Sequence, residues 1–168
     1  HLKPTNDSWR VDETYVKVKG QWMYLYRAVD SKGNTIDFYL SKARNKQAAK
    51  RFFKKALAFS HVSKPRVITV DKNPAYPIAI QELKEEKQMP EGIQLRQVKY
   101  LNNIVEQDHR FIKKRIRPML GLKSLRTAKR IIAGIEAMHM IKKGQTLQRE
   151  KSVQKQKEFI HQLFGLVA

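Results

Sequence analysis

The first forty residues alternate between apolar and polar positions with the period of a β-strand. β-Branched and aromatic residues are concentrated in three segments, from Trp9 to Val18, from Trp22 to Val29 and from Thr35 to Leu40. The sequences between these segments, Gly20-Gln21 and the Asp-Ser-Lys-Gly-Asn stretch at 30–34, are typical of turns that join antiparallel strands. We therefore expect three antiparallel strands.

Beyond residue 43 the apolar positions change to a helical period. One face of this helix is marked by Ala48, Phe52, Ala56 and Phe59. Asn73-Pro74 is typical of an N-cap followed by proline in the first helical turn. The elements expected after the third strand are a helix over 43–60, a strand over 67–70, a helix to about Lys87, a strand over 93–98, a helix containing Glu106, and helices over 122–143 and 150–164.

This element order predicts an α/β fold: a mixed sheet of three antiparallel strands, then alternating helices and strands, with extra C-terminal helices. At 168 residues the chain fits one domain. We expect a lead-in over 1–8, a core over 9–143 and a helical extension over 144–168. The extension is amphipathic (Val153, Ile160, Leu163, Phe164), which predicts packing on the core or on a partner subunit.

Net charge indicates the partner. The chain has 35 Lys and Arg against 15 Asp and Glu, a formal charge of +20. Residues 96–149 hold 14 Lys or Arg and three acids, so they supply +11 of it. Nucleic acid is the expected partner, because its phosphates favour Lys and Arg through counterion release. No apolar run approaches the roughly 20 residues of a membrane span, and no membrane partner is expected. The start lacks both Met and the apolar stretch of a signal peptide, which suggests a fragment without its natural N-terminal part.

Three acids on separate predicted elements form the candidate site. Asp12 lies within the first strand, Asp71 ends the 67–70 strand, and Glu106 opens a basic helix. The chain has no cysteine, so oxygen ligands are the remaining metal donors. Three carboxylates facing a polyanion are suited to metal-assisted phosphodiester chemistry. Taken singly, Asp71 is also a turn residue, Glu106 has capping-box spacing from Asn103, and Asp12 is tolerable on an exposed strand face.

The helix that follows carries two stripes. Glu106, Arg110, Lys113 and Arg117 form a polar stripe, which is either a DNA-phosphate surface or an ordinary row of ion pairs. Val105, His109, Ile112 and Ile116 form an apolar stripe, so His109 is expected to be a packed histidine rather than a catalytic base. The other acids have other expected places: Glu13 on the opposite sheet face, Asp30 in a turn, Asp37 paired with a cation, Asp108 off the Glu106 face. Trp22, Tyr24 and Tyr26 are expected to pack on the sheet.

The motifs around the three acids resemble those of a known family. Asp-Glu-Thr-Tyr at Asp12, Asp-Lys-Asn-Pro-Ala-Tyr at Asp71 and Lys-Tyr-Leu-Asn-Asn-Ile-Val-Glu-Gln-Asp-His-Arg around Glu106 resemble the catalytic motifs of DDE transposases. The 34 residues between Asp71 and Glu106 resemble the spacing of the IS-six family of bacterial insertion sequences. Lys113, seven residues after Glu106, matches a basic position seen in many such enzymes and in retroviral integrases.

The resemblance implies a ribonuclease H-like fold and two Mg²⁺ or Mn²⁺ ions bound by Asp12, Asp71 and Glu106. It also implies metal-dependent cleavage and strand transfer on double-stranded DNA, at transposon ends and target, by a bacterial cytoplasmic, nucleoid-associated homo-oligomer. The residues expected to contact DNA are Lys99, Asn102, Asn103, Arg110, Lys113, Lys114, Arg115 and Arg117. The alternatives are a non-catalytic DNA-binding remnant of a transposase and a basic RNA-binding structural protein.

Overall fold

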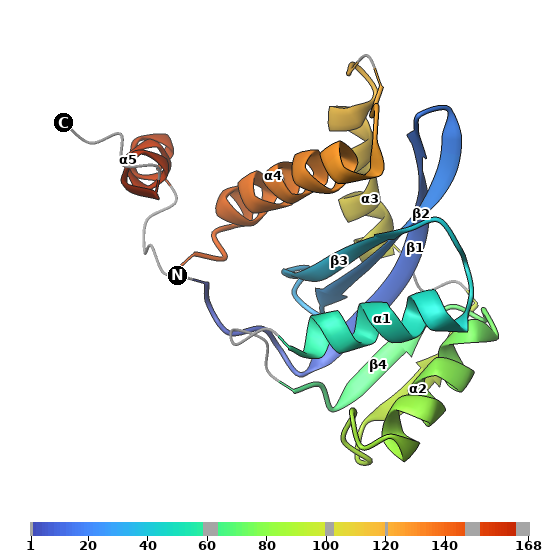
Figure 1. Ribbon diagram of the computed structural model, residues 1–168. Coiled ribbons are helices and arrows are strands. Elements are labelled where there is room, and N and C mark those ends of the chain that lie inside the picture. Colours follow the sequence, from blue (N-terminus) through green and yellow to red (C-terminus); the bar gives the residue numbers. More distant parts are fainter. Residues whose placement is uncertain (1, 59–63, 100–102, 120, 147–151, 164–168) are drawn as a thin grey trace.

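The computed structural model describes residues 2–58, 64–99, 103–119, 121–146 and 152–163. Its centre is a five-stranded mixed sheet in the order β3-β2-β1-β4-β5 (Figure 1). The strands are β1 (Ser8–Val18), β2 (Gln21–Asp30), β3 (Thr35–Ser41), β4 (Val67–Val70) and β5 (Gln94–Gln97). β1, β2 and β3 pair antiparallel, whereas β4 pairs parallel with both β1 and β5. The predicted mixed α/β sheet is therefore confirmed.

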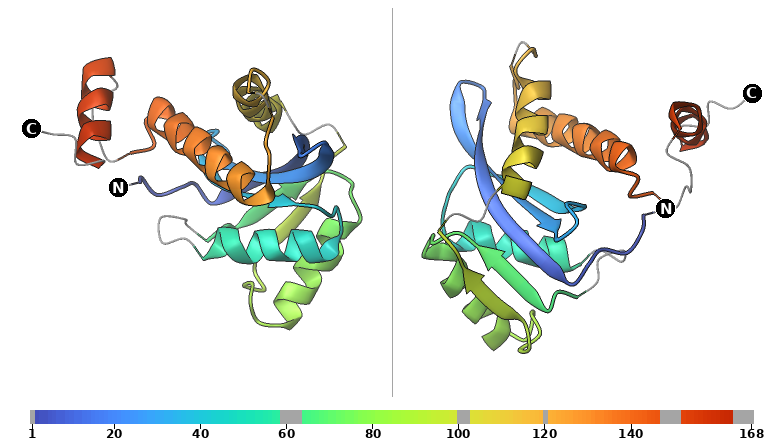
Figure 2. Two further views of the ribbon diagram at one scale, coloured as in Figure 1. Left: turned by 45° about the horizontal axis from the view of Figure 1, so that its top comes forward. Right: turned by 180° about the vertical axis from the view of Figure 1, so that it is seen from behind.

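Helices cover both faces of the sheet (Figure 2). The first layer contains α1 (Lys46–Leu57) and α2 (Ala75–Glu85), which pack on each other. The second contains α3 (Asn103–Ile116), which contacts β1 and β2, and α4 (Leu125–Lys143), which contacts β3. The site described below lies where β1 and β4 meet α3.

Alternation along β1 divides its side chains between two cores. Trp9 and Val11 join the apolar core under α1 and α2. Val16 and Val18 join the core under α3 and α4. Since successive strand residues point to opposite faces, Asp12 is directed toward α3 and Glu13 toward α2.

Element boundaries differ from the predictions by a few residues, for reasons of capping. α1 begins at Lys46 rather than 43, because the side chain of Asn45 accepts a hydrogen bond from the Ala48 N–H. α4 begins at Leu125 rather than 122, because Ser124 caps it. Leu122 instead forms a bridge with Val18 of β1.

The helix after Asn73-Pro74 begins one residue later than predicted, because Pro74 takes the N-cap position and Ala75 is the first helical residue. Asn73 nevertheless contacts the start of the helix. Its side-chain oxygen accepts a hydrogen bond from the Ala75 N–H at 3.0 Å, and Pro74 follows in a helical conformation. The helix ends at Glu85, two residues before the predicted Lys87, which has a positive φ of 55°. Phe59 of the predicted first-helix face lies outside the described residues.

The C-terminal helix α5 (Val153–Leu163) lies apart from the sheet in both figures. Val153 is 83% exposed, so this predicted packing position does not pack on the core here. Phe164 lies outside the described residues. In the part of the chain that is described, no helix is long and apolar enough to span a membrane.

Candidate metal and DNA site

The pairing of β1 with β4 brings the first two predicted acids together. Arg10 is opposite Thr69 in the parallel register, so two residues further along each strand Asp12 comes beside Asp71. Asp12, Glu13 and Asp71 each offer a carboxylate oxygen, and these oxygens lie within 4.8 Å of one another. Such a cluster of hard oxygen donors suits a divalent cation.

The structure adds Glu13 to this cluster, although it was expected on the opposite sheet face from Asp12. It does leave the opposite face of β1 from Asp12, as alternation requires. Its carboxylate nevertheless approaches the same point, because Asp71 lies beyond the end of β4 and is reached from both sides. The sequence did place Glu13 next to Asp12. Strand alternation nevertheless predicted that the two side chains would lie on opposite faces.

A set of polar neighbours holds Glu13 in place. Its side chain is only 2% exposed. It accepts hydrogen bonds from Asn73 Nδ2 at 3.0 Å, from the Tyr76 hydroxyl and from Arg44. The Arg44 guanidinium also lies 3.7 Å from Asp71. These bonds satisfy much of the hydrogen-bonding capacity of the Glu13 carboxylate.

The Asp12 carboxyl is poised between its protonated and ionised forms near neutral pH. Burial raises its pKa to about 7, and the charges of Glu13 and Asp71 act in the same direction. The Glu13 N–H and the Arg44 charge oppose this rise. Burial also raises the pKa of Asp71, against a hydrogen bond from the Asn73 N–H. A bound cation would relieve the repulsion that both shifts report.

Glu106 lies in the first turn of α3 and is exposed. It does not belong to the group of three carboxylates within 4.8 Å. Its helix does reach the site, since His109, one turn further on, has Nδ1 4.0 Å from Asp12 Oδ2. The fold thus brings Asp12 and Asp71 together and sets Glu106 on the adjoining helix, but leaves its carboxylate outside the cluster.

His109 is packed, as expected. It is 5% exposed, beside Ile112, which is fully buried. Burial lowers the pKa of His109 to about 3, helped by the charges of Arg27 and Lys113. The imidazole is therefore neutral at pH 7 and presents an uncharged surface to Asp12.

Asp108 has a structural role that its place on the helix did not reveal. It accepts from Lys143 Nζ at 2.6 Å, and its other oxygen lies 3.2 Å from His139 Nε2. It also lies 3.4 Å from Arg27, which forms a bidentate pair with Glu136 at 2.6 and 2.9 Å. Burial alone would raise the pKa of Asp108, but His139, Arg27 and Lys143 outweigh it and lower the pKa to about 2. This network joins α3 and α4 to β2.

The predicted DNA contacts form an accessible basic surface along α3. Arg110, Lys114, Arg115 and Arg117 are exposed and Lys113 is partly exposed. The Arg115 guanidinium lies over the Phe111 ring at 5.4 Å. Lys99, after β5, is also exposed. Asn102 lies outside the described residues, and only the backbone of Asn103 is described, as the start of α3.

Of the remaining predictions for aromatic and acidic residues, some are confirmed and one is wrong. Asp30 accepts three hydrogen bonds from Lys32 and Asn34 of its turn and a fourth from the Asn6 N–H. Asp37 pairs with Lys55 at 2.6 Å, and both acids lie where they were expected. Tyr26 is buried. Trp22 is 62% exposed, so it is not packed in the core: it lies two residues after the tight turn at Lys19-Gly20 and meets Tyr15 edge-on across the hairpin.

Comparison with known proteins decides the family. The model of the family described as "DDE domain" matches residues 6–145. The chain belongs to the DDE transposase domain family. It is 38% identical over 135 residues to the transposase for insertion sequence-like element IS431mec of Staphylococcus aureus strain Mu50, and equally to that of insertion sequence element IS257 in transposon Tn4003 of S. aureus. Each match covers 80% of this chain and 58% of the relative, so the chain spans just over half their length.

A solved structure supports the fold of this DDE domain. The HTLV-2 integrase catalytic core domain in complex with magnesium superposes with a TM-score of 0.57 at 18% identity, covering 84% of this chain and 88% of that one. The fold is therefore ribonuclease H-like, as the motif resemblance implied.

Proposed function

We propose that this DDE domain is the catalytic part of a transposase that cleaves DNA at insertion-sequence ends and joins the ends to target DNA. The observation that carries the proposal is the meeting of Asp12 and Asp71 at the β1–β4 junction in a chain of charge +20. Membership of the family supports it, and so do the names of the staphylococcal relatives.

The residues present fit a divalent cation. The carboxyls of Asp12 and Asp71 are partly buried, have raised pKa values and lie close together. Carboxylate oxygens are the donors that Mg²⁺ and Mn²⁺ bind. Asp12 and Asp71 would share two ions, and Glu106 would complete the second site from α3. The related integrase core was solved with magnesium, which supports the choice of metal.

The ions, when bound, supply Lewis-acid activation of the attacking oxygen and stabilisation of the leaving oxygen. The chain's own residues bind and orient the substrate. Arg110 and Lys113 lie on successive turns of α3 after Glu106, and Arg117 follows its last residue, so they would hold phosphates flanking the scissile bond. Lys99, Asn102, Asn103, Lys114 and Arg115 would extend this contact. Neutral His109 and buried Ile112 keep the wall behind Asp12 free of competing charge.

The chemistry would run in two steps on double-stranded DNA. Water attacks the phosphodiester at an element end, forming a new P–O bond while the bond to the 3′ oxygen breaks. The freed 3′-hydroxyl then attacks a target phosphodiester and displaces its 3′ oxygen. Pairing two ends requires more than one copy, so the full-length protein would act as a homo-oligomer; the HTLV-2 core was described as a dimeric form.

The test is nicking and joining of supercoiled plasmid in Mn²⁺, comparing the parent with Glu106→Gln and Asp12→Asn. The matched control is Glu91→Gln, which changes an exposed acid in the turn between α2 and β5. We expect activity in the parent and in the control, and at least a 100-fold loss in both site variants. Equal activity in all four would contradict the proposal. A silent parent that still binds DNA would favour the non-catalytic remnant.

A further inference from the structure

A large cavity lies along the edge of β1 beyond its pairing with β4. Its volume is about 810 Å³, and it is enclosed by the β1–β2 hairpin and the C-terminal end of α3. The residues that matter here are Tyr15, Trp22 and Tyr24 from the hairpin, and Lys113, Ile116 and Arg117 from α3. Lys113 and Arg117 already have proposed contacts with DNA phosphates, but the aromatic residues that line this cavity have no part in the proposed reaction.

The hairpin geometry presents the aromatic rings together. Lys19 and Gly20 have φ values of 48° and 78°, typical of the tight turn that puts cross-strand residues in register. Tyr15 then faces Tyr24, with ring centroids 5.2 Å apart, and Tyr15 meets Trp22 edge-on at 6.4 Å. Trp22 is 62% and Tyr15 46% exposed. Exposed aromatic clusters of this kind mark binding surfaces rather than core.

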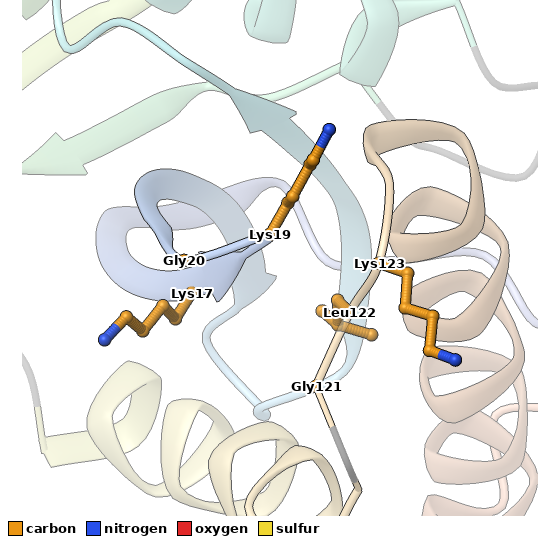
Figure 3. A pocket seen from close by; sticks show the side chains of 6 residues that line it. All are labelled: Lys17, Lys19, Gly20, Gly121, Leu122 and Lys123. Atoms are coloured by element: carbon orange, nitrogen blue, oxygen red, sulfur yellow. The ribbon is translucent and has the colours of Figure 1, made fainter.

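The charged residues that the structure shows lining the cavity are all basic. Lys113 and Arg117 line one side, and Lys17 lies over the Trp22 ring at 5.6 Å. A second, smaller cavity of about 420 Å³ continues past the hairpin tip, lined by Lys17, Lys19 and Lys123 (Figure 3). Among the residues that the structure describes, no acidic residue lines either cavity.

The three lysines around the smaller cavity project in different directions rather than converging (Figure 3). A small anion would need converging donors to be held by several lysines at once. Diverging ammonium groups instead suit an extended polyanion, whose phosphates are several ångströms apart along a strand. Aromatic rings next to such a cationic track are the combination that binds single-stranded nucleic acid, since bases stack on the rings.

We propose that this aromatic cavity binds a nucleobase unstacked from the end of a DNA strand, while Lys17, Lys19 and Lys123 bind the phosphates beside it. Only an unpaired base exposes the ring faces that Trp22, Tyr15 and Tyr24 would contact. This proposal rests on the proposed function, because the bound base would hold the end of a frayed DNA strand close to the carboxylates where cleavage would occur.

The distance from the carboxylates agrees with this purpose. Tyr15 is three residues from Asp12 along β1, about 10 Å at the rise of a strand. Lys113 is seven residues from Glu106, about 10 Å along α3. A base in the cavity would therefore lie within a few nucleotides of a phosphate at the carboxylates.

The test measures binding of a duplex with a three-nucleotide single-stranded overhang carrying 2-aminopurine, against the same duplex with blunt ends. EDTA is present, so binding is separated from catalysis. We expect Trp22→Ala to weaken overhang binding about 5- to 100-fold, the loss typical of removing one stacking ring. It should change blunt-duplex binding less than twofold. Trp22→Phe should retain most of the affinity and the quenching of 2-aminopurine.

The matched control is Ile78→Ala, which removes another exposed apolar side chain on α2, in the opposite helix layer. It should bind both duplexes like the parent. The proposal is overturned if Trp22→Ala binds the overhang as tightly as the parent, or if it loses affinity equally for both duplexes. Failure of the proposed function is distinguishable: Asp12→Asn and the parent would then bind the overhang alike, yet neither would cut or join plasmid.

Discussion

At the scale of single residues, Asp12 combines two demands that oppose each other. As an acid on a half-buried strand face it is destabilising when ionised, and yet only the ionised form can hold a metal ion. The fold tolerates this because Asp71 and Glu13 have partners in Arg44 and Asn73. The stability of the metal-free domain should therefore depend on the protonation of Asp12.

The first prediction concerns that pH dependence. The folded pKa of Asp12 is about 7, above the ordinary 3.8, so its stability contribution is present below pH 4 and is lost as pH rises through 7. Each pKa unit corresponds to about 1.4 kcal/mol. In EDTA, Asp12→Asn should remove this loss and unfold in urea with a flatter pH profile between 4 and 8. An unchanged profile would contradict the raised pKa; Glu91→Gln is the control.

The second prediction concerns metal binding. Above pH 7, millimolar Mn²⁺ should raise the melting temperature of the parent, because a ligand of the folded state alone stabilises it. Asp12→Asn and Asp71→Asn should each remove most of the shift. Glu106→Gln should reduce it less, since Glu106 lies outside the carboxylate cluster. A full shift in Asp12→Asn would place the ion elsewhere.

At the scale of elements, the helix that carries Glu106 is fixed to the sheet through its buried neighbour Asp108. Arg27 is fully buried in β2 and pairs with Glu136 of α4 and with Asp108 of α3. Lys143 and His139 of α4 complete the network. The orientation of α3 relative to Asp12 therefore depends on charges that do not touch the carboxylate cluster.

The third prediction follows from this network. Arg27→Met would leave Asp108 and Glu136 buried with fewer cations, a change that typically costs about 3–5 kcal/mol of unfolding free energy. Urea unfolding measures it. The double variant Arg27→Met/Glu136→Leu should recover part of the loss, because it removes one buried charge together with its partner. If Arg27→Met cost no more than an exposed substitution such as Arg126→Met, the network would not stabilise the fold.

The element boundaries show how far local sequence carried the fold. Strand alternation and helical periodicity predicted the described strands and helices in order, because the elements of the core, such as β1 and α1, each have one face buried against the sheet or its helices. The ends shifted by a few residues where a cap such as Ser124 or Asn45 decided the start. The exposure of Trp22 was missed, because an aromatic residue next to a hairpin turn has the same local pattern whether or not a core reaches it.

At the scale of the whole molecule, the excess of positive charge should govern binding to double-stranded DNA. Neutralising each phosphate contact changes the slope of log affinity against log salt by about 0.9. As the fourth prediction, Lys113→Gln and Arg117→Gln should each make the slope shallower by roughly one, and the double variant by about two. Lys87→Gln, in the turn after α2, is the control. Slopes unchanged in both α3 variants would show that DNA binds another face.

The sequence by itself determined the element order, the two acids Asp12 and Asp71 that lie side by side, the burial of His109 and the expected polyanionic partner. These follow from periodicity, motif spacing and net charge, which are local or additive properties. Only the tertiary structure decided that Glu13 joins Asp12 and Asp71, that Asp108 links α3 to Arg27, and that Tyr15, Trp22 and Tyr24 enclose a cavity with α3. Each depends on the distance between segments remote in sequence, which strand register and helix packing set and no local pattern contains.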